Sequence, residues 1–171
     1  MLKVLESLNR VHFRHIVWVL AISETLHNIE EAIWLPAWSH TAGMWHPSVT
    51  AFEFRFAVIA ITLLFYGVIW YFSRYGTKAS RYLLGGALVI ILFNVFIPHL
   101  IATIALSQYA PGAISGILFN IPVTLYLLRR GMREGFFTPR ELVLGTIVFT
   151  VVAGTLLPVS FAVGRLIDSL A

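Results

Sequence analysis

The sequence predicts an all-α membrane protein, a polytopic bundle of five transmembrane helices that forms one integral-membrane domain over residues 1–171. Two observations carry this prediction. Hydrophobic residues make up 58% of the chain and charged residues only 12%, a balance too apolar for an ordinary soluble domain. The apolar residues also form continuous runs, whereas a transmembrane barrel alternates polar and apolar side chains, so helices must satisfy the backbone.

Four of the five helices are predicted from long, nearly uncharged stretches of sequence. These stretches are residues 56–72, 82–106, 113–128 and 142–163. At a rise of about 1.5 Å per residue, each is close to the length of a helix that crosses the hydrocarbon core of a bilayer.

The first helix, expected at residues 15–34, is assigned by counting basic residues, because its polar side chains lower its hydropathy. If this segment spans the membrane, ten of the 12 Lys and Arg residues share one face: Lys3, Arg10, Arg14, Arg74, Lys78, Arg81, Arg129, Arg130, Arg133 and Arg140. Only Arg55 and Arg165 then lie opposite. Without this span the division is seven against five. The positive-inside rule therefore favours five spans, a cytoplasmic N-terminus and an external C-terminus.

Composition also excludes several classes of function. The chain has no cysteine, so disulfides, thiolate metal ligands and cysteine nucleophiles are ruled out. The topology pattern accounts for the net charge of +4, so we expect no nucleic-acid partner. A cleaved signal peptide is an alternative for the N-terminus, but no small-residue cleavage site follows the apolar run, so we expect the mature chain to keep this helix.

The first predicted helix carries four ionisable side chains, Glu24, His27, Glu30 and Glu31. At about 100° per residue they fall within an arc of about 120°, so they project from one side of the helix. Three carboxylates at bilayer depth oppose insertion by about 8–10 kcal/mol, a cost that usually marks a functional site. We expect this face to point into the bundle, where polar side chains of other spans can contact it.

Polar residues on the third and fourth predicted spans lie at matching depths. The third span contains Asn94, Pro98 and His99, and the fourth contains Asn120 and Pro122. Because proline has no N–H, Pro98 frees the carbonyl of Asn94 and kinks the helix. The kink can turn both Asn94 and His99 toward the interior.

Imidazoles and carboxylates gathered at one depth have the composition of a divalent-metal site, with Zn²⁺ first and Fe²⁺ or Mn²⁺ as alternatives. His27 and Glu31 are four residues apart and can chelate one ion from a single helix. Together with His99 they would form a three-ligand site that leaves a position for water, as in catalytic zinc sites.

The other polar residues have predicted roles beside this site. Glu30 would be the general base that activates the water, or a ligand to a second metal. Asn94 or Asn120 would donate a hydrogen bond to a developing oxyanion, although each is also typical of a packing contact between helices. Glu24 belongs to the same polar face, where a packing hydrogen bond is an equal alternative.

A di-iron site is a weaker alternative. Glu24 and His27 match the Glu-x-x-His element of di-iron bundles. Such sites use two of these elements, and the residue three positions before His99 is Phe96.

The pattern H27-x-x-E30-E31 resembles the HXXEE family, small polytopic bacterial membrane proteins named for this motif. The pair Asn94 and His99, the Pro111-Gly112 dipeptide and Asn120 resemble later motifs of the family, and the resemblance covers about residues 15–125. It implies that His27, Glu30, Glu31, Asn94, His99 and Asn120 are site positions. It also implies a bacterial plasma membrane as the location.

The function predicted from these residues is a membrane-embedded, metal-dependent hydrolase acting on a lipid or other membrane-soluble substrate, with its site in the outer half of the bilayer. The first alternative is a proton- or cation-coupled transporter, which with five spans and no internal repeat would need a homo-oligomer. The second alternative is a noncatalytic membrane assembly protein.

Overall fold

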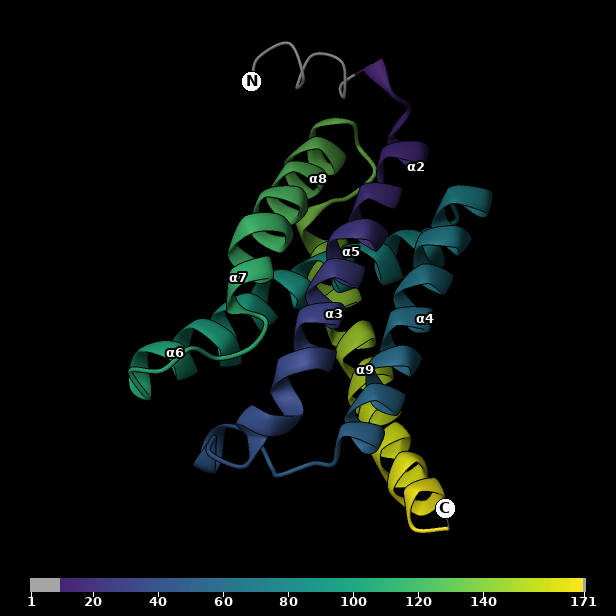
Figure 1. Cartoon of the computed structure of the whole chain (residues 1–171). Helices are drawn as coiled ribbons and strands as arrows, with labels where there is room; N and C mark the ends of the chain where they lie inside the picture. The colour runs from purple at the N-terminus through teal and green to yellow at the C-terminus, as the bar shows by residue number, and fades with distance from the viewer. Residues whose placement is uncertain (1–9, 171) are drawn as a thin grey trace.

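The computed structural model describes residues 10–170 and shows an all-α protein, as the sequence predicts (Figure 1). No strand occurs among these residues. Lys3, which belongs to the topology count, lies outside the described residues. The helices pack side by side, and the first and last described segments, near residues 10 and 170, lie at opposite ends of the bundle.

Within residues 10–170, three helices are long and apolar enough to cross a membrane. They are α4 (Ala51–Tyr75), the stretch Lys78–Ala105 made of α5 (Lys78–Asn94), η2 (Val95–Leu100) and α6 (Ile101–Ala105), and α9 (Pro139–Asp168). Thr50, Thr77 and Thr138 cap their N-terminal ends, each accepting a backbone hydrogen bond through its side chain. The predicted second, third and fifth helices are therefore confirmed, each with somewhat different ends.

The other two predicted spans do not form long apolar helices. α3 (Trp18–Ser39) has 22 residues, but its three carboxylates make it too polar. The fourth span is divided into α7 (Ala113–Ser115), the π-helical turn η3 (Gly116–Asn120) and α8 (Ile121–Arg133). Of the five predicted transmembrane helices, three are thus long and apolar enough to cross a membrane within the described residues. α3 differs from these three because it carries three carboxylates, and the fourth segment differs because a π-helical turn divides it into shorter helices.

The C-terminal end of α3 corrects a predicted boundary. The sequence predicts that the first helix ends at residue 34, whereas α3, which follows the short helix α2 (Phe13–Ile16), continues through Pro36 to Ser39. Proline cannot donate to the carbonyl of Ala32 one turn earlier. Arg55 Nε on α4 donates to that carbonyl at 3.2 Å, so a bond between helices replaces the missing one. A single turn, η1 (Gly43–Trp45), then leads to α4.

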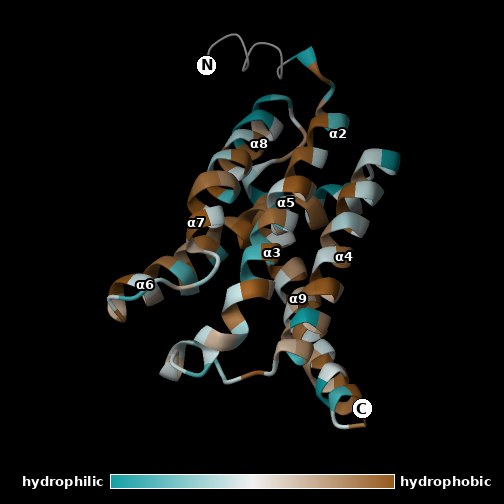
Figure 2. Ribbon diagram, in the orientation of Figure 1, coloured by the Kyte–Doolittle hydropathy of each residue, from teal (hydrophilic) through white to brown (hydrophobic). Residues whose placement is uncertain are grey.

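The long helices form the apolar frame of the bundle. α9 packs against both α4 and α5, and the rings of Phe65 and Phe149 meet in the core. Gly86 on α5 faces Gly145 on α9 so closely that a Cβ at Gly86 would overlap the Gly145 carbonyl. Figure 2 shows hydrophobic residues along most of the bundle and a polar stretch midway along α3.

The basic residues of the described chain are divided between the two ends of the bundle. Ser73, near the end of α4, donates a hydrogen bond to the carbonyl of Arg14, and Arg130 on α8 donates to the carbonyl of Val11. The ends of α4 and α8 therefore lie beside the N-terminal segment (Figure 1). Most of the described Lys and Arg residues belong to these segments or to the residues that follow them in sequence. At the opposite end, Arg165 Nε lies 2.5 Å from Glu53 Oε1.

Candidate metal centre

The polar face of α3 turns into the bundle, as predicted. His27 is 1% exposed and Glu24 is 5% exposed, whereas Glu31 retains partial contact with the exterior of the chain. The opposite face of the helix is apolar and outward, with Ile22, Leu26, Ile29 and Ile33 all exposed. α3 therefore has its polar side inside and its apolar side outside, the reverse of a helix on the surface of a soluble protein.

His99 reaches this face because the third long helix breaks. Ile97 has non-helical backbone angles (φ −128°, ψ 110°), and Pro98 cannot donate a backbone hydrogen bond. The π-helical turn η2 that contains this break carries His99 into the interior, where it is 3% exposed. Such turns are frequent at functional sites because they redirect side chains that a regular helix would hold elsewhere.

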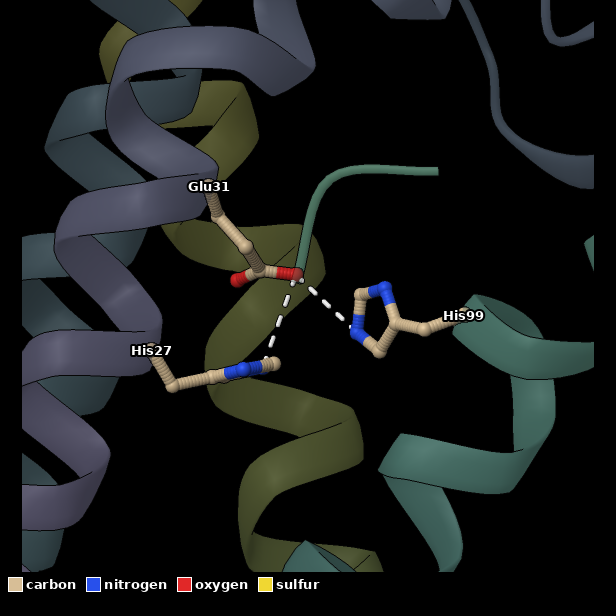
Figure 3. A group of neighbouring side chains, drawn as sticks. All are labelled: His27, Glu31 and His99. Carbon is tan, nitrogen blue, oxygen red and sulfur yellow. Dashed lines mark ion pairs between the residues drawn. The ribbon is translucent and has the colours of Figure 1, made fainter. Parts of the chain in front are cut away.

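Glu31 joins the two histidines at the centre of the bundle (Figure 3). Its Oε1 atom lies 3.2 Å from His99 Nε2 and 3.8 Å from His27 Nε2. One ligand atom from each of these three residues lies within 4.8 Å of the others. Two imidazole nitrogens and a carboxylate oxygen suit Zn²⁺, Fe²⁺ or Mn²⁺, so this donor set fits the predicted ion.

Asn94 lies against both histidines. Its Nδ2 atom is 3.2 Å from His27 Nε2 and 3.0 Å from His99 Nε2. A single amide therefore bridges the two imidazoles on the side where their ligand nitrogens face one another. Of the two asparagines predicted near the site, Asn94 is the one in contact with these histidines.

Ser115 orients His27 from the other side of its ring. The Ser115 hydroxyl lies 3.1 Å from His27 Nδ1. When Nδ1 carries the proton and donates it to this hydroxyl, Nε2 keeps its lone pair and directs it toward Glu31 and Asn94. Ligand histidines in metalloproteins use the same arrangement, in which a hydrogen bond at one ring nitrogen fixes the tautomer and the orientation of the other.

Gly112 closes over both imidazoles. Its φ angle is +93°, a left-handed conformation that favours glycine. A Cβ there would lie 2.6 Å from His99 Cε1 and 2.8 Å from His27 Cε1, closer than side-chain atoms approach one another. Two independent constraints, backbone conformation and space, therefore require glycine at this position.

Glu30 binds the segment that contains Gly112. Its Oε1 accepts hydrogen bonds from the Tyr109 hydroxyl and from Gly112 N at 2.8 Å, and its Oε2 accepts one from Ser115 N at 2.7 Å. Partial desolvation of this 39% exposed side chain, together with the Glu30 carboxylate, raises the pKa of Tyr109, so the phenol remains a donor at neutral pH. Glu30 thus fixes the turn that covers the histidines, and its predicted role as general base stays a prediction.

Glu24 and Asn120 form a second buried pair. Asn120 Nδ2 donates to Glu24 Oε2 at 3.0 Å, and the Ser23 hydroxyl donates to Asn120 Oδ1 at 2.5 Å. Asn120 is fully buried and contacts Glu24 rather than the histidines. The polar residues predicted from sequence therefore converge as two adjacent groups, one around Glu31 and one around Glu24.

A cavity of about 220 Å³ lies beside both groups. Glu24, Glu31, Asn94 and His99 lie on its polar side. Most of the remaining wall is apolar and comes from α3, α4, α5 and α9, with Phe65 and Phe149 among its side chains. Glu30 and Asn120 are absent from the cavity lining in the described structure. Glu24 therefore faces the space that a ligand would occupy.

Three residues of this centre were not predicted as site residues. Tyr109 gave no signal, because a tyrosine between two helices is common at a membrane interface. Ser115 is a small residue in a predicted span, where packing is the ordinary explanation. The Pro111-Gly112 dipeptide did give a signal as a resemblance to a family motif, but its position over the histidines depends on contacts between distant segments.

These observations define a helical protein with membrane-type helices and a buried His–Glu–His centre. The chain belongs to the family described as proteins of unknown function with an HXXEE motif, whose model matches residues 18–127. It is also 38% identical over 146 residues to the uncharacterized protein YrkK of Bacillus subtilis (strain 168), an alignment covering 82% of this chain and 89% of that protein. No solved structure matches the chain.

The matched range contains both polar groups and the segment that covers them. The three named positions of the motif are His27, Glu30 and Glu31. In this structure they have different contacts: His27 and Glu31 face His99, whereas Glu30 holds the turn at Gly112. The motif therefore contains two candidate metal ligands, His27 and Glu31, and one residue, Glu30, that holds the backbone covering them.

Proposed function

We propose that this protein is a metal-dependent hydrolase of the bacterial plasma membrane that acts on a lipid or another membrane-soluble substrate. The observation that carries the proposal is the meeting of His27, Glu31 and His99 beside a largely apolar cavity. An ion held by these residues would supply Lewis-acid chemistry. One carboxylate in the ligand group favours a single ion over a di-iron site, which needs several.

The proposal includes five spans, with the N-terminus in the cytoplasm and the C-terminus outside. The reversed amphipathicity of α3 supports the first span, because its exposed Ile22 and Ile29 suit lipid while its carboxylates find partners inside. Residues 113–133 are helical throughout and long enough for the fourth span. The gathering of cations at one end supports the orientation through the positive-inside rule.

Glu24 is our candidate for the group that moves protons. It faces the cavity and accepts a hydrogen bond on Oε2, whereas Glu30 accepts three hydrogen bonds from Tyr109, Gly112 and Ser115. Hydrolysis of an ester would add the hydroxyl of water to the acyl carbon and break the acyl C–O bond. Glu24 would carry the proton from the water to the leaving oxygen. Asn94 would donate a hydrogen bond to the acyl oxygen.

Elemental analysis tests the metal centre. The protein is purified in detergent without an affinity His-tag, and its Zn, Fe and Mn contents are measured with and without added metal. We expect about one equivalent of ion in wild type and its loss in His27→Ala, Glu31→Ala and His99→Ala. His40→Ala, which removes an exposed histidine of α3's C-terminal end, is the control and should keep the ion. A wild type that cannot bind added ions would refute the metal centre.

A second experiment separates hydrolysis from transport and assigns the base. Metal content, cleavage of a p-nitrophenyl acyl ester and pH-dependent flux in liposomes are compared in Glu24→Gln and Glu30→Gln. We expect Glu24→Gln to keep its metal and lose ester cleavage by at least about 100-fold. Loss confined to Glu30→Gln would instead support the base predicted from sequence. If wild type cleaves no ester and Glu24→Gln loses the pH-dependent flux, a proton relay is favoured. The burial of Glu24 is the main argument for that alternative.

A further inference from the structure

The cavity beside the centre has one polar side and one apolar side. The apolar side is built by side chains from four helices, including Phe54, Phe65, Phe149 and Phe161. The polar side holds Glu24, Asn28, Glu31, Asn94 and His99. A ligand that fits both sides has a polar group joined to an apolar segment.

The size of the cavity limits the apolar segment. A dry protein cavity of about 150 Å³ accommodates benzene, with its six carbon atoms. In the same proportion, a cavity of about 220 Å³ holds roughly nine non-hydrogen atoms. This corresponds to a chain of about eight carbons with its polar group, or to a short isoprenoid segment.

The charges in the cavity limit the polar group. The wall contains two carboxylates, Glu24 and Glu31, and none of the residues that line it is Lys or Arg. In the protein stripped of metal, an anionic head group would be repelled at this position and would find no Lys or Arg to pair with. An uncharged oxygen-containing group can instead accept hydrogen bonds there.

A neutral donor without a partner also lies in the wall. Trp38 lines the cavity and is 8% exposed, and its indole N–H makes no hydrogen bond within the described part of the chain. Buried donors are normally paired, so an unpaired one at a cavity points to an acceptor supplied by a ligand. An indole N–H is neutral and donates only, which suits an uncharged oxygen.

A second hollow adjoins the cavity toward the end of the bundle near Arg165. The two share His46, Leu157 and Phe161 in their walls. The second hollow is bordered by Pro47 and Arg165, near the C-terminal end of α9. The part of a longer ligand that exceeds the cavity can extend past His46 in this direction.

We infer that the cavity binds an uncharged single-chain lipid, an alcohol or its ester, with an apolar segment of about eight carbons inside the bundle. This inference names the substrate class of the proposed hydrolase and in that sense rests on it. Binding itself depends on the cavity, so the test is performed on protein stripped of metal with a chelator. Ligand binding in the cavity and metal binding at the centre are then measured separately.

The probe is 8-bromo-1-octanol, whose bromine quenches tryptophan fluorescence on contact and which has ten non-hydrogen atoms. We expect a saturable quenching component in wild type that Trp38→Phe removes, because Trp38 lies in the cavity wall. We expect 8-bromooctanoate, the anionic counterpart, to bind at least tenfold more weakly. Quenching without saturation, or equal binding of the carboxylate, would overturn the inference.

Two variants on one turn of α9 separate the cavity from the lipid phase. Ala153→Phe fills the cavity, and Val152→Phe places the same ring on the exposed side of the helix. The saturable component should disappear in the first variant and persist in the second. If Ala153→Phe does not fold, Ala57→Leu fills the same cavity from α4. Equal quenching in the filled and control variants would also overturn the inference.

His27→Ala distinguishes the two proposals. It removes a candidate metal ligand that is not among the described residues lining the cavity. Alcohol binding that persists in this variant while wild type holds no metal would support the cavity and refute the metal centre. Metal bound in wild type without saturable alcohol binding would support the metal centre and refute the cavity as a lipid-binding site.

Discussion

The two halves of this bundle are built in different ways. α4, α5 and α9 are regular apolar helices that meet through aromatic side chains and the Gly86–Gly145 contact. α3 and the segment from η2 to α8 contain two π-helical turns, a backbone break at Ile97 and a left-handed glycine at 112. The polar residues of the candidate centre are concentrated in this second half or at its border.

The two halves of the bundle therefore have different roles. A regular helix presents its side chains at fixed steps of about 100°, so it cannot turn both Asn94 and His99, about 140° apart, toward one point. Breaks in the backbone permit it, but they expose polar groups that need partners. The regular half forms a rigid frame and one wall of the cavity, while the irregular half carries most of the polar side chains of the candidate centre.

The largest expected effect comes from breaking the frame. In Gly86→Val, the new side chain overlaps the Gly145 carbonyl, and neither backbone can yield without separating α5 from α9. We expect destabilisation of about 3 kcal/mol, measured by thermal unfolding in detergent and by yield. Gly67→Val on α4 is the control, since a Cβ there meets nothing within 4 Å. Wild-type melting of Gly86→Val would mean that α5 and α9 do not meet at this contact.

The next effect comes from the turn over the histidines. In Gly112→Ala, left-handed strain of about 1–2 kcal/mol adds to the overlap with both imidazoles. We expect zinc affinity, measured by competition with a chelator, to fall by at least about 100-fold, the upper range for residues that support metal ligands. Gly43→Ala is a matched control because its φ is +59° and its surroundings are open. Equal losses in both variants would attribute the effect to strain alone.

A smaller effect is expected from the hydroxyl that orients His27. Ser115→Ala removes the partner of Nδ1 and leaves the backbone bond from Ser115 N to Glu30 in place. We expect zinc affinity to fall by about tenfold with little change in melting. Ser80→Ala, at an equally buried serine of the regular half, should leave zinc affinity unchanged. Unchanged affinity in Ser115→Ala would show that the tautomer of His27 is fixed by other contacts.

The smallest effect is expected at Tyr109. Tyr109→Phe removes one of the three bonds to Glu30, so hydrogen exchange of residues 106–113 should increase while metal affinity falls by no more than about threefold. Tyr75→Phe, at an exposed tyrosine of α4, is the control. Since the pKa of Tyr109 is raised above its ordinary value of 10.0, its bond is complete below pH 10 and is lost only above it. Wild-type protection that declines between pH 7 and 9 would contradict this assignment.

The sequence predicted the interior face of α3 because a helix has a fixed period. His27 and Glu31 are one turn apart, and lipid excludes the charged side from the surface. It also predicted that the helix carrying His99 breaks at Pro98, since proline removes a donor. The direction of the break could not be predicted, because it is set by Ile97 and by packing against α3.

The hydrogen-bond partners of Glu30 could not be predicted from the sequence around it. This residue shares the polar arc of α3 with Glu31, and their sequence environments are nearly the same. Its hydrogen-bond partners lie 79 to 85 positions away along the chain. Likewise, α3 extends beyond its predicted end because Arg55, on another helix, satisfies the carbonyl that Pro36 leaves free.

The separation of these partners in sequence has a consequence for biogenesis. In a nascent chain α3 is complete before Asn94, Ser115 and Asn120 have been synthesised, and these partners lie 67, 88 and 96 positions from theirs on α3. Until they emerge, Glu24 and Glu30 lack the hydrogen-bond donors that they have in the folded bundle. The first span proposed above should therefore wait at the membrane surface or beside the insertion machinery, and enter the membrane late, together with the segments that complete its interior face.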